Sequence, residues 1–335
     1  MAKRNLIITG GSGYIGSALA VVSAKNYNVF TIDKKTKNYF IRNQKIKHFK
    51  CNLNNIKKIK KIIKSINPDI IVHLAAQSTL DFINIKRNSY LKDNLMATNN
   101  LVKITRDLNI KKFIFSSSAS VYKQKNQPIS EMDNLLPNNL YGKTKLKNEK
   151  FIKKTFKLSK TKYCILRFFN VCSSLKKNLV GEFHSPETHL LPKVVNALIN
   201  RNRISIFGNN YSSKDGTCIR DYIHIKDIVS GILKSINYLE KNQSNTFNLG
   251  SGRSYSVMDI IKKCSKKISV KPKIIIEKPR NLDASKLVCK INKARKLLKW
   301  NPANSNISKI ISDEIWWFKF LKKKKYLRTF YNLKK

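Results

Sequence analysis

A tyrosine and a lysine four residues apart are the strongest candidates for proton transfer in this 335-residue chain. They are Tyr141 and Lys145, and they follow the serine-rich run SSSASVY at residues 116–122. If residues 141–158 form a helix, the two side chains lie on one face and can meet at one site. A free phenol has a pKa of about 10, and a nearby cation favours its phenolate form. With the hydroxyl of Ser118, the pair can therefore act as a base toward a substrate hydroxyl.

The glycine-rich segment GGSGYIG at residues 10–16 predicts a dinucleotide-binding turn because of what surrounds it. It lies between an apolar run that suits a buried strand, residues 6–9, and a helical pattern at residues 15–24. A second expected strand, residues 29–32, leads directly to Asp33. In such a unit a pyrophosphate sits at the helix amino terminus and the acid can accept a hydrogen bond from the ribose 2′-hydroxyl, which favours NAD. The cofactor contacts expected here are Gly10, Gly13, Gly16 and Asp33.

Strand and helix patterns continue to alternate along the first half of the chain. Further strands are expected at residues 70–74, 112–116 and 163–168, with helices at 89–108 and 141–158. This alternation predicts an α/β fold with a doubly wound parallel sheet of the Rossmann type. We expect an NAD-binding domain at residues 1–175 and a smaller mixed α/β substrate domain at 176–335. The run TFNL at residues 246–249 is expected to return to the first sheet.

The composition is strongly basic, with 68 Lys and Arg against 19 Asp and Glu and a formal net charge of +49. Because the lysines are spread along the whole chain, we interpret them as overuse of lysine, with only nonspecific affinity for polyanions at low salt. An alternative of another class is a non-enzymatic NAD-bound sensor with a basic nucleic-acid-binding surface.

Location and metal content are predicted from the remaining composition. Six cysteines without CxxC spacing indicate reduced thiols and a cytoplasmic protein. No run of 18 apolar residues occurs, so no membrane span is expected. Two histidines, His184 and His189, lie close in sequence, but no third ligand is evident beside them, so no metal site is expected.

The three motifs GGSGYIG, SSSASVY and YGKTK together resemble the extended short-chain dehydrogenase/reductase superfamily. Within it, bacterial UDP-glucose 4-epimerases are similar in further blocks, namely GEFHSPETHLLP at residues 181–192, ISIFGNNYSSKDGTCIRDYIH at 204–224 and NLGSG at 248–252. The resemblance extends to about residue 302. It implies NAD-dependent epimerisation at C4 of a UDP-hexose through a transient 4-keto sugar. It also implies a homodimer in which the helices at 89–108 and 141–158 form a four-helix bundle.

The resemblance implies three sets of site residues. The catalytic residues are Ser118, Tyr141 and Lys145. Besides the glycines and Asp33, the cofactor contacts are Tyr14, Ile15, Asn52, Leu53, Leu74, Ala75, Ala76, Asn94, Tyr141, Lys145 and Phe169. The substrate contacts are Ser118, Tyr141, Asn170, His189, Leu190, Phe207, Arg220, Val257, Arg280, Asp283 and Leu287. Two arginines suit a diphosphate, and Phe207 offers an apolar wall to uracil.

Departures from the family pattern leave the choice of sugar open. Asn52 is an amide where an acid is common, which predicts a weaker adenine contact. Leu287 occupies the position that tunes sugar size, where a tyrosine would exclude N-acetyl sugars. UDP-N-acetylglucosamine or UDP-glucuronate 4-epimerisation, or decarboxylation, are therefore alternatives. A dehydratase is disfavoured because Ala119 and Ser120 stand where its acid pair would be.

Overall fold

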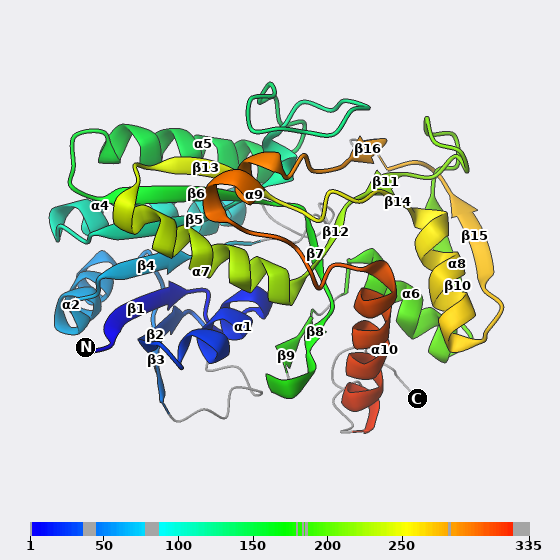
Figure 1. Ribbon diagram of the computed structural model, residues 1–335, viewed down its shortest axis with the longest axis horizontal. Coiled ribbons are helices and arrows are strands. Elements are labelled where there is room, and N and C mark those ends of the chain that lie inside the picture. Colours follow the sequence, from blue (N-terminus) through cyan, green and yellow to red (C-terminus); the bar gives the residue numbers. More distant parts are fainter. Residues whose placement is uncertain are drawn as a thin grey trace.

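The computed structural model describes residues 2–35, 45–77, 87–178, 180–182, 184, 187–280 and 283–323. Its centre is a seven-stranded sheet with the order β13-β6-β5-β4-β1-β2-β3 (Figure 1). All neighbouring strands pair in parallel, which confirms the doubly wound sheet. The strands are β1 (Arg4–Thr9), β2 (Tyr27–Asp33), β3 (Ile46–Lys50), β4 (Ile70–His73), β5 (Lys112–Ser118), β6 (Lys162–Phe168) and β13 (Asn245–Leu249).

Helices cover both faces of this sheet because its strands are apolar on both sides, as parallel strands usually are. In β1, Leu6 and Ile8 pack with α1 (Tyr14–Ser23) and α7 (Ile225–Lys241), whereas Ile7 belongs to the cluster on the opposite face. On that opposite face lie α2 (Ile56–Ile66), α4 (Ala97–Asp107) and α5 (Leu140–Phe156). The lysine-rich α2 is amphipathic in this way, since its isoleucines after Ile56 are buried at helical spacing.

Residues 87–107 form three consecutive helical segments instead of the single helix expected at 89–108. They are α3 (Arg87–Tyr90), the π-helical η1 (Leu91–Met96) and α4. A π segment has i→i+5 hydrogen bonds over a single turn inside a longer helix, so the periodicity of the chain did not predict it.

A second group of elements lies to the right of the sheet in Figure 1. The parallel pair β10 (Arg203–Phe207) and β15 (Lys273–Glu277) lies there with α6 (Leu190–Ile199), α8 (Val257–Ile268) and α10 (Ile307–Lys323). These helices enclose a separate hydrophobic cluster that includes Trp317. Short strands connect this group to the sheet: β7 (Asn170–Cys172), β8 (Ser174–Leu175), β9 (Val180–Gly181), β11 (Ile219–Arg220), β12 (Tyr222–His224), β14 (Tyr255–Ser256) and β16 (Lys286–Leu287).

The chain passes between the two groups more than once. Helix α7 and strand β13 return to the first sheet, and α9 (Asn292–Leu298) packs on both of them. The strand predicted at 246–249 therefore joins the sheet, beside β6. Within the part of the chain that the structure describes, no helix is long and apolar enough to cross a membrane.

Candidate active site

The loop after β1 has the geometry of an anion-binding turn. Gly10 has φ +73°, and a Cβ on it would lie 2.7 Å from the Ala75 nitrogen. A Cβ on Gly16 would lie 2.1 Å from the Gly10 carbonyl oxygen, so both positions require glycine. Helix α1 starts after Gly13 without a side-chain cap or an acid in its first turn. The first N–H groups of the helix are therefore available to a phosphate.

Asp33 lies at the end of β2 against this loop, where the sequence placed it. Its Oδ2 accepts a hydrogen bond from the Ser12 amide at 3.0 Å, and its Oδ1 accepts one from the Lys35 amide at 3.0 Å. Lys34 forms an ion pair with Asp93 at 2.7 Å, so its ammonium points away from the carboxylate of Asp33. Asn52 is exposed, and its side-chain oxygen accepts from the Asn54 amide at 2.9 Å.

Asn94 fixes the loop that follows β4. Its buried side chain accepts a hydrogen bond from the Gln77 amide at 2.6 Å and donates one to the Gln77 carbonyl at 3.0 Å. That loop also contains Leu74, Ala75 and Ala76, and it lies beside Gly10. The structure therefore places Asn94 as a support for the loop rather than as an open side chain.

Four other expected cofactor contacts have side chains engaged within the protein. The Tyr14 hydroxyl donates to the Ser173 carbonyl at 2.6 Å, and Ile15 packs against the core on the α1 side of the sheet. Leu53 and Phe169 are buried in hydrophobic clusters. At Leu53 and Phe169 the backbone, and not the side chain, is the part a ligand could contact.

Ser118, Tyr141 and Lys145 come together where β5 ends and α5 begins. Asn139 caps α5 by accepting a hydrogen bond from the Gly142 amide at 2.8 Å, which places Tyr141 in the first turn. The Ser118 hydroxyl lies close enough to the Tyr141 phenol to lower its pKa. The Lys145 ammonium lies 5.7 Å from the centre of the Tyr141 ring and donates to the Ser116 carbonyl at 2.7 Å.

Burial shifts the pKa values of this pair in opposite directions. It raises the pKa of Tyr141 to about 12, and the nearby Ser118 hydroxyl offsets only part of that shift. It lowers the pKa of Lys145 to about 7, against the opposing influence of Glu149. In the protein without cofactor, burial thus outweighs the expected activation of the phenol by the lysine. A low-dielectric site disfavours both the phenolate and the ammonium. Activation then requires a further positive charge beside the phenol.

A buried ion pair beneath this site was not anticipated from the sequence. Arg167 donates to both carboxylate oxygens of Glu149, at 2.9 and 2.6 Å, and to the Tyr122 hydroxyl at 2.7 Å. The Ser117 hydroxyl also donates to Glu149, at 2.5 Å. These contacts tie α5 to β5 and β6 and hold the helix that carries the tyrosine and the lysine.

A cavity of about 820 Å³ lies in the second group of elements. Its lining includes eight of the expected substrate contacts: Asn170, His189, Leu190, Phe207, Arg220, Val257, Arg280 and Asp283. Ser118, Tyr141 and Leu287 are not among its lining residues. Leu287 is paired with Arg220 between β16 and β11 and packs against the hydrophobic cluster that contains Ala119. It therefore lies between the cavity and the catalytic group.

Two guanidinium groups face this cavity. Arg220 donates to the Ala284 carbonyl at 2.6 Å and lies 3.7 Å from an Asp283 oxygen. Arg280 stacks on Phe207, with its guanidinium carbon 3.7 Å from the ring centre. The apolar wall expected at Phe207 is thus covered by an arginine in this structure. The cavity joins two cations and one aromatic face, which suits an aromatic base that carries phosphates.

Asp221 is a supporting residue that the sequence interpretation missed. Its buried carboxylate accepts hydrogen bonds from the Ser251 amide and hydroxyl, the Gly252 amide and the Cys289 amide, at 2.6 to 3.1 Å. It therefore holds the NLGSG turn and the segment that follows Leu287 beside Arg220. The sequence did contain a pointer to this residue, because Asp221 is the acidic residue of the RDYIH motif at residues 220–224.

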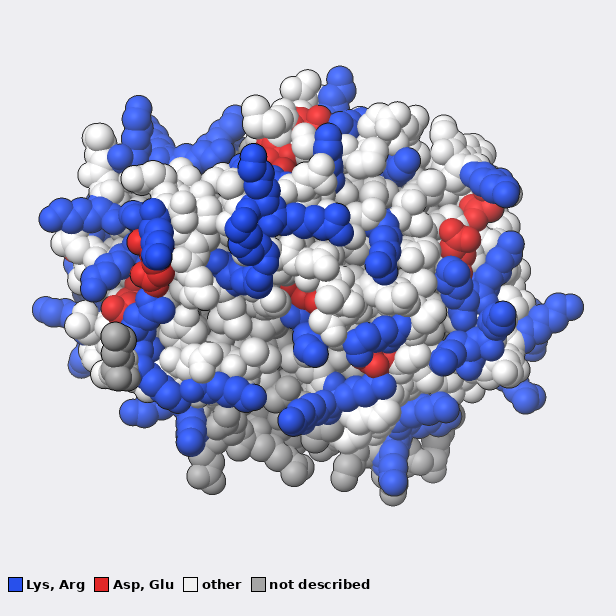
Figure 2. Space-filling view, viewed as in Figure 1, with Lys and Arg blue, Asp and Glu red and all other residues white. Residues whose placement is uncertain are grey.

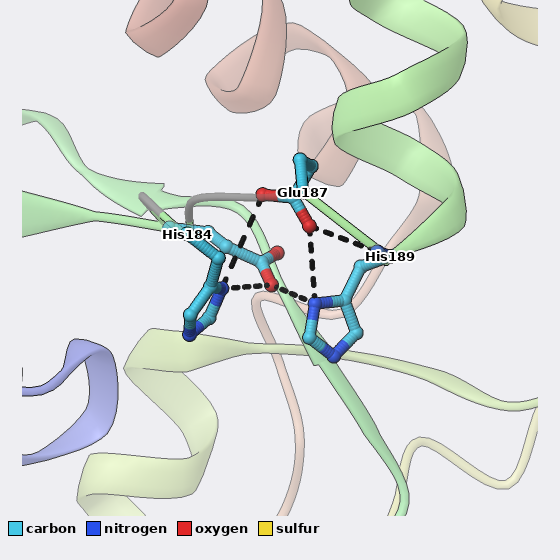
Figure 3. A group of neighbouring side chains, drawn as sticks. His184, Glu187 and His189 are labelled. Carbon is cyan, nitrogen blue, oxygen red and sulfur yellow. Dashed lines mark hydrogen bonds and ion pairs between the residues drawn. The ribbon is translucent and has the colours of Figure 1, made fainter. Parts of the chain in front are cut away.

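The expectation that no third ligand accompanies the two histidines is wrong. Glu182, His184, Glu187 and His189 each offer a ligand atom, and all four atoms lie within 4.8 Å of one another. Figure 3 shows the rings of His184 and His189 turned toward the same space beside Glu187. The charge of Glu182 raises the pKa of His189 well above its usual value. The pattern E-x-H-x-x-E-x-H was present in the 181–192 block.

Comparisons with known proteins agree with this geometry. The profile of the NAD dependent epimerase/dehydratase family matches residues 6–250. The UDP-glucose 4-epimerase of Halalkalibacterium halodurans is 31% identical over 318 residues, which cover 94% of this chain and 95% of that protein. A UDP-glucose 4-epimerase from Bifidobacterium longum, solved in complex with NAD+ and UDP, superimposes with a TM-score of 0.88 at 26% identity, covering 94% and 98% of the chains. The UDP-Glc/GlcNAc 4-epimerase from Campylobacter jejuni superimposes with a TM-score of 0.81 at 32% identity. The match covers 95% of this chain and 99% of that one.

Proposed function

This chain belongs to the NAD-dependent epimerase/dehydratase family, and we propose that it interconverts UDP-glucose and UDP-galactose at C4 of the sugar. One observation carries the proposal. Ser118, Tyr141 and Lys145 meet where β5 ends and α5 begins, and the second group of elements forms a cavity that holds two arginines. This reaction needs a group that transfers a proton, a turn that holds the cofactor and a pocket that holds a diphosphate. The chain has a candidate for each of them.

The residues of the first domain fit NAD. The turn at residues 10–16 excludes side chains at Gly10 and Gly16, and the uncapped start of α1 faces that turn. Asp33 lies beside it with a carboxylate suited to a ribose hydroxyl. NAD held by these residues would supply the hydride acceptor for C4 of the sugar and the hydride donor for the return step.

Tyr141 is the group that moves the proton. Its phenolate takes the proton of the 4-hydroxyl as the sugar is oxidised, and the phenol gives that proton back as the 4-keto sugar is reduced. Burial alone raises the pKa of this phenol, so Lys145 and the positively charged nicotinamide ring of bound NAD would together have to supply the positive charge that lowers it. Ser118 holds the same substrate oxygen by a hydrogen bond.

Arg220 and Arg280 keep the nucleotide in place while the keto sugar turns over. Both line the cavity, and a guanidinium fork matches the oxygens of a diphosphate. The sugar must expose both faces of C4 in turn, so strong contacts to the nucleotide and weaker contacts to the sugar suit the reaction.

UDP-N-acetylglucosamine is a second substrate candidate. The Campylobacter jejuni relative is named for both sugars, and Leu287 is smaller than the tyrosine that would exclude an N-acetyl group. UDP-glucuronate chemistry is not favoured, because these curated relatives are named UDP-glucose 4-epimerases. A non-enzymatic sensor is not favoured, because it has no use for the Tyr141–Lys145 pair.

The proposal is tested by a proton NMR time course with UDP-galactose and no added cofactor. We expect wild-type protein to form UDP-glucose, and the Tyr141→Phe variant to be slower by at least ~10²-fold, because it lacks only the phenolic oxygen. A variant as fast as wild type would remove Tyr141 from the mechanism. If wild type converts nothing even with added NAD, the choice of substrate is wrong.

We also propose a homodimer in the cytoplasm. The resemblance supports pairing through α4 and α5, which pack side by side within one chain. All six cysteines are buried and unpaired, as expected for a reducing compartment. The outer face of α5 carries the exposed lysines Lys143, Lys147 and Lys150, so pairing through this face must overcome like-charge repulsion.

A further inference from the structure

We propose that Glu182, His184, Glu187 and His189 bind a divalent transition-metal ion, with Zn²⁺ as the best match. This inference goes beyond the epimerisation and concerns a structural site. The four residues belong to the segment between β9, which ends at Gly181, and α6, which begins at Leu190. Two imidazoles and two carboxylates form a mixed nitrogen and oxygen donor set that suits zinc.

The spacing of the donor atoms fits a single ion. Glu182 Oε1 lies 2.6 Å from His189 Nδ1 and 3.2 Å from His184 Nδ1. The second carboxylate, from Glu187, lies 3.2 Å from His189 Nδ1 and 4.0 Å from His184 Nδ1. Zinc bonds of about 2.1 Å at tetrahedral angles place neighbouring ligands roughly 3.4 Å apart. Only small side-chain movements are therefore needed to seat the ion.

Hydrogen bonds alone satisfy this cluster poorly. Glu182 Oε2 and His184 Nδ1 are buried and have no hydrogen-bond partner among the described residues. His184 Nδ1 lies 3.2 Å from a Glu182 oxygen, so the two atoms are close without hydrogen-bond geometry. Glu182 is only 4% exposed. A cation between the rings would partner both nitrogens and a carboxylate oxygen at once.

Negative charge and second-sphere contacts also favour a cation. Glu182 and Glu187 bring two carboxylates into this cluster. Glu187 Oε1 accepts hydrogen bonds from the Thr188 and His189 amides, both at 2.8 Å, which orients this carboxylate. The Trp317 indole donates to the Glu182 carbonyl at 2.7 Å. Such contacts preorganise metal ligands.

The ion would brace one wall of the nucleotide cavity. Glu182, Glu187 and His189 line that cavity, and Leu190 follows them at the start of α6. The ion holds this wall against the rest of the fold, so its expected consequence is a fixed cavity shape.

The test is a zinc competition titration against a chromophoric chelator, with protein made without a polyhistidine tag and stripped of metal. Wild type should take up about one Zn²⁺ per chain, and Co²⁺ in its place should give the visible absorption of a tetrahedral site. The variants His184→Ala and Glu187→Gln should each weaken binding by at least ~10–100-fold, the loss that removal of a partner behind a ligand already causes. The control is His48→Ala, which removes a histidine on β3 and should leave the affinity unchanged.

Equal zinc affinity in wild type and in both ligand variants would overturn the proposal, as would an equal loss in the His48→Ala control. Circular dichroism establishes that each variant is folded. If His184→Ala does not fold, the nearly isosteric Glu187→Gln decides the outcome. The readout needs no turnover, so it stays independent of whether the chain epimerises UDP-glucose.

Discussion

At the scale of single residues, the catalytic pair is buried in a way that opposes its own chemistry. Burial raises the pKa of Tyr141 to about 12 and lowers that of Lys145 to about 7. The site therefore keeps Tyr141 protonated, with no base available, until a positively charged cofactor lies beside it. This arrangement couples proton removal to cofactor binding, which suits an enzyme that must not oxidise its substrate without a hydride acceptor.

Replacing Lys145 with methionine should separate activity from stability. We expect Lys145→Met to lower kcat by at least ~10²-fold, because the phenol loses its neighbouring cation. In cofactor-free protein the same change should raise the free energy of unfolding, because a buried ammonium is removed. The pKa of Lys145 in the folded protein, about 7, lies below its ordinary value of 10.5. The gain in the free energy of unfolding should therefore be complete below pH 7, where the ammonium is charged in both states, and should decrease as the pH rises toward 10.5.

Urea unfolding of the two cofactor-free proteins at pH 6 and pH 9 measures this difference. A stability gain that grows with pH would contradict the assigned protonation of Lys145.

The sequence predicted residues whose role depends on local spacing, and it failed where the role depends on tertiary surroundings. Gly10 and Gly16 were found because the strand–turn–helix pattern requires glycine at those positions. Tyr141 and Lys145 were found because four residues bring side chains onto one helix face. The direction of the Tyr141 pKa was not found, because burial is a property of the folded chain.

At the scale of elements, periodicity predicted the long amphipathic pieces and missed the irregular ones. Strands β1, β4, β5 and β6 lie within a few residues of their expected ranges, because buried parallel strands are continuous apolar runs. Strand β3 is polar at most of its positions, since it forms the sheet edge, and it carried no strand signal. The Glu149–Arg167 pair was missed because it joins α5 to β6 across 18 residues.

Helix α10 depends on a charged contact that can be tested by pH. Asp313 accepts hydrogen bonds from His224 at 3.2 Å and Lys309 at 2.9 Å, and pairs with Lys176 at 2.7 Å. Burial raises its pKa, but these three contacts outweigh burial and lower the pKa below 3.8. We expect Asp313→Asn to reduce the free energy of unfolding by ~1–3 kcal/mol at pH 7.

The pH dependence gives the sign of this effect. A lowered carboxyl pKa contributes stability above pH 4 that is lost as pH falls further, so the deficit of Asp313→Asn should shrink below about pH 4. Urea unfolding at pH 7 and pH 3 measures both deficits. An unchanged deficit at pH 3 would show that packing, and not charge, docks the helix.

At the scale of the whole molecule, positive charge is distributed rather than gathered. Figure 2 shows Lys and Arg side chains spread over the visible face, with few acidic groups between them. This agrees with lysine overuse and offers no single basic patch on that face for a nucleic acid. The net charge of +49 should nevertheless govern how two chains meet.

Salt should therefore strengthen the proposed dimer. The exposed lysines of α5 repel their counterparts in a second copy, and this repulsion is screened as the Debye length falls. Sedimentation velocity at ~50 mM and ~500 mM salt should show a larger dimer fraction at the higher concentration. Dissociation by added salt would contradict an interface through α5.

The central claim is that C4 is oxidised and then reduced by the same hydride within one chain. The most direct measurement uses UDP-galactose with deuterium at C4, no added cofactor, and mass spectrometry of the product. The account predicts UDP-glucose that retains deuterium at C4, with no reduced cofactor released. Product that has exchanged its deuterium for solvent hydrogen would contradict it.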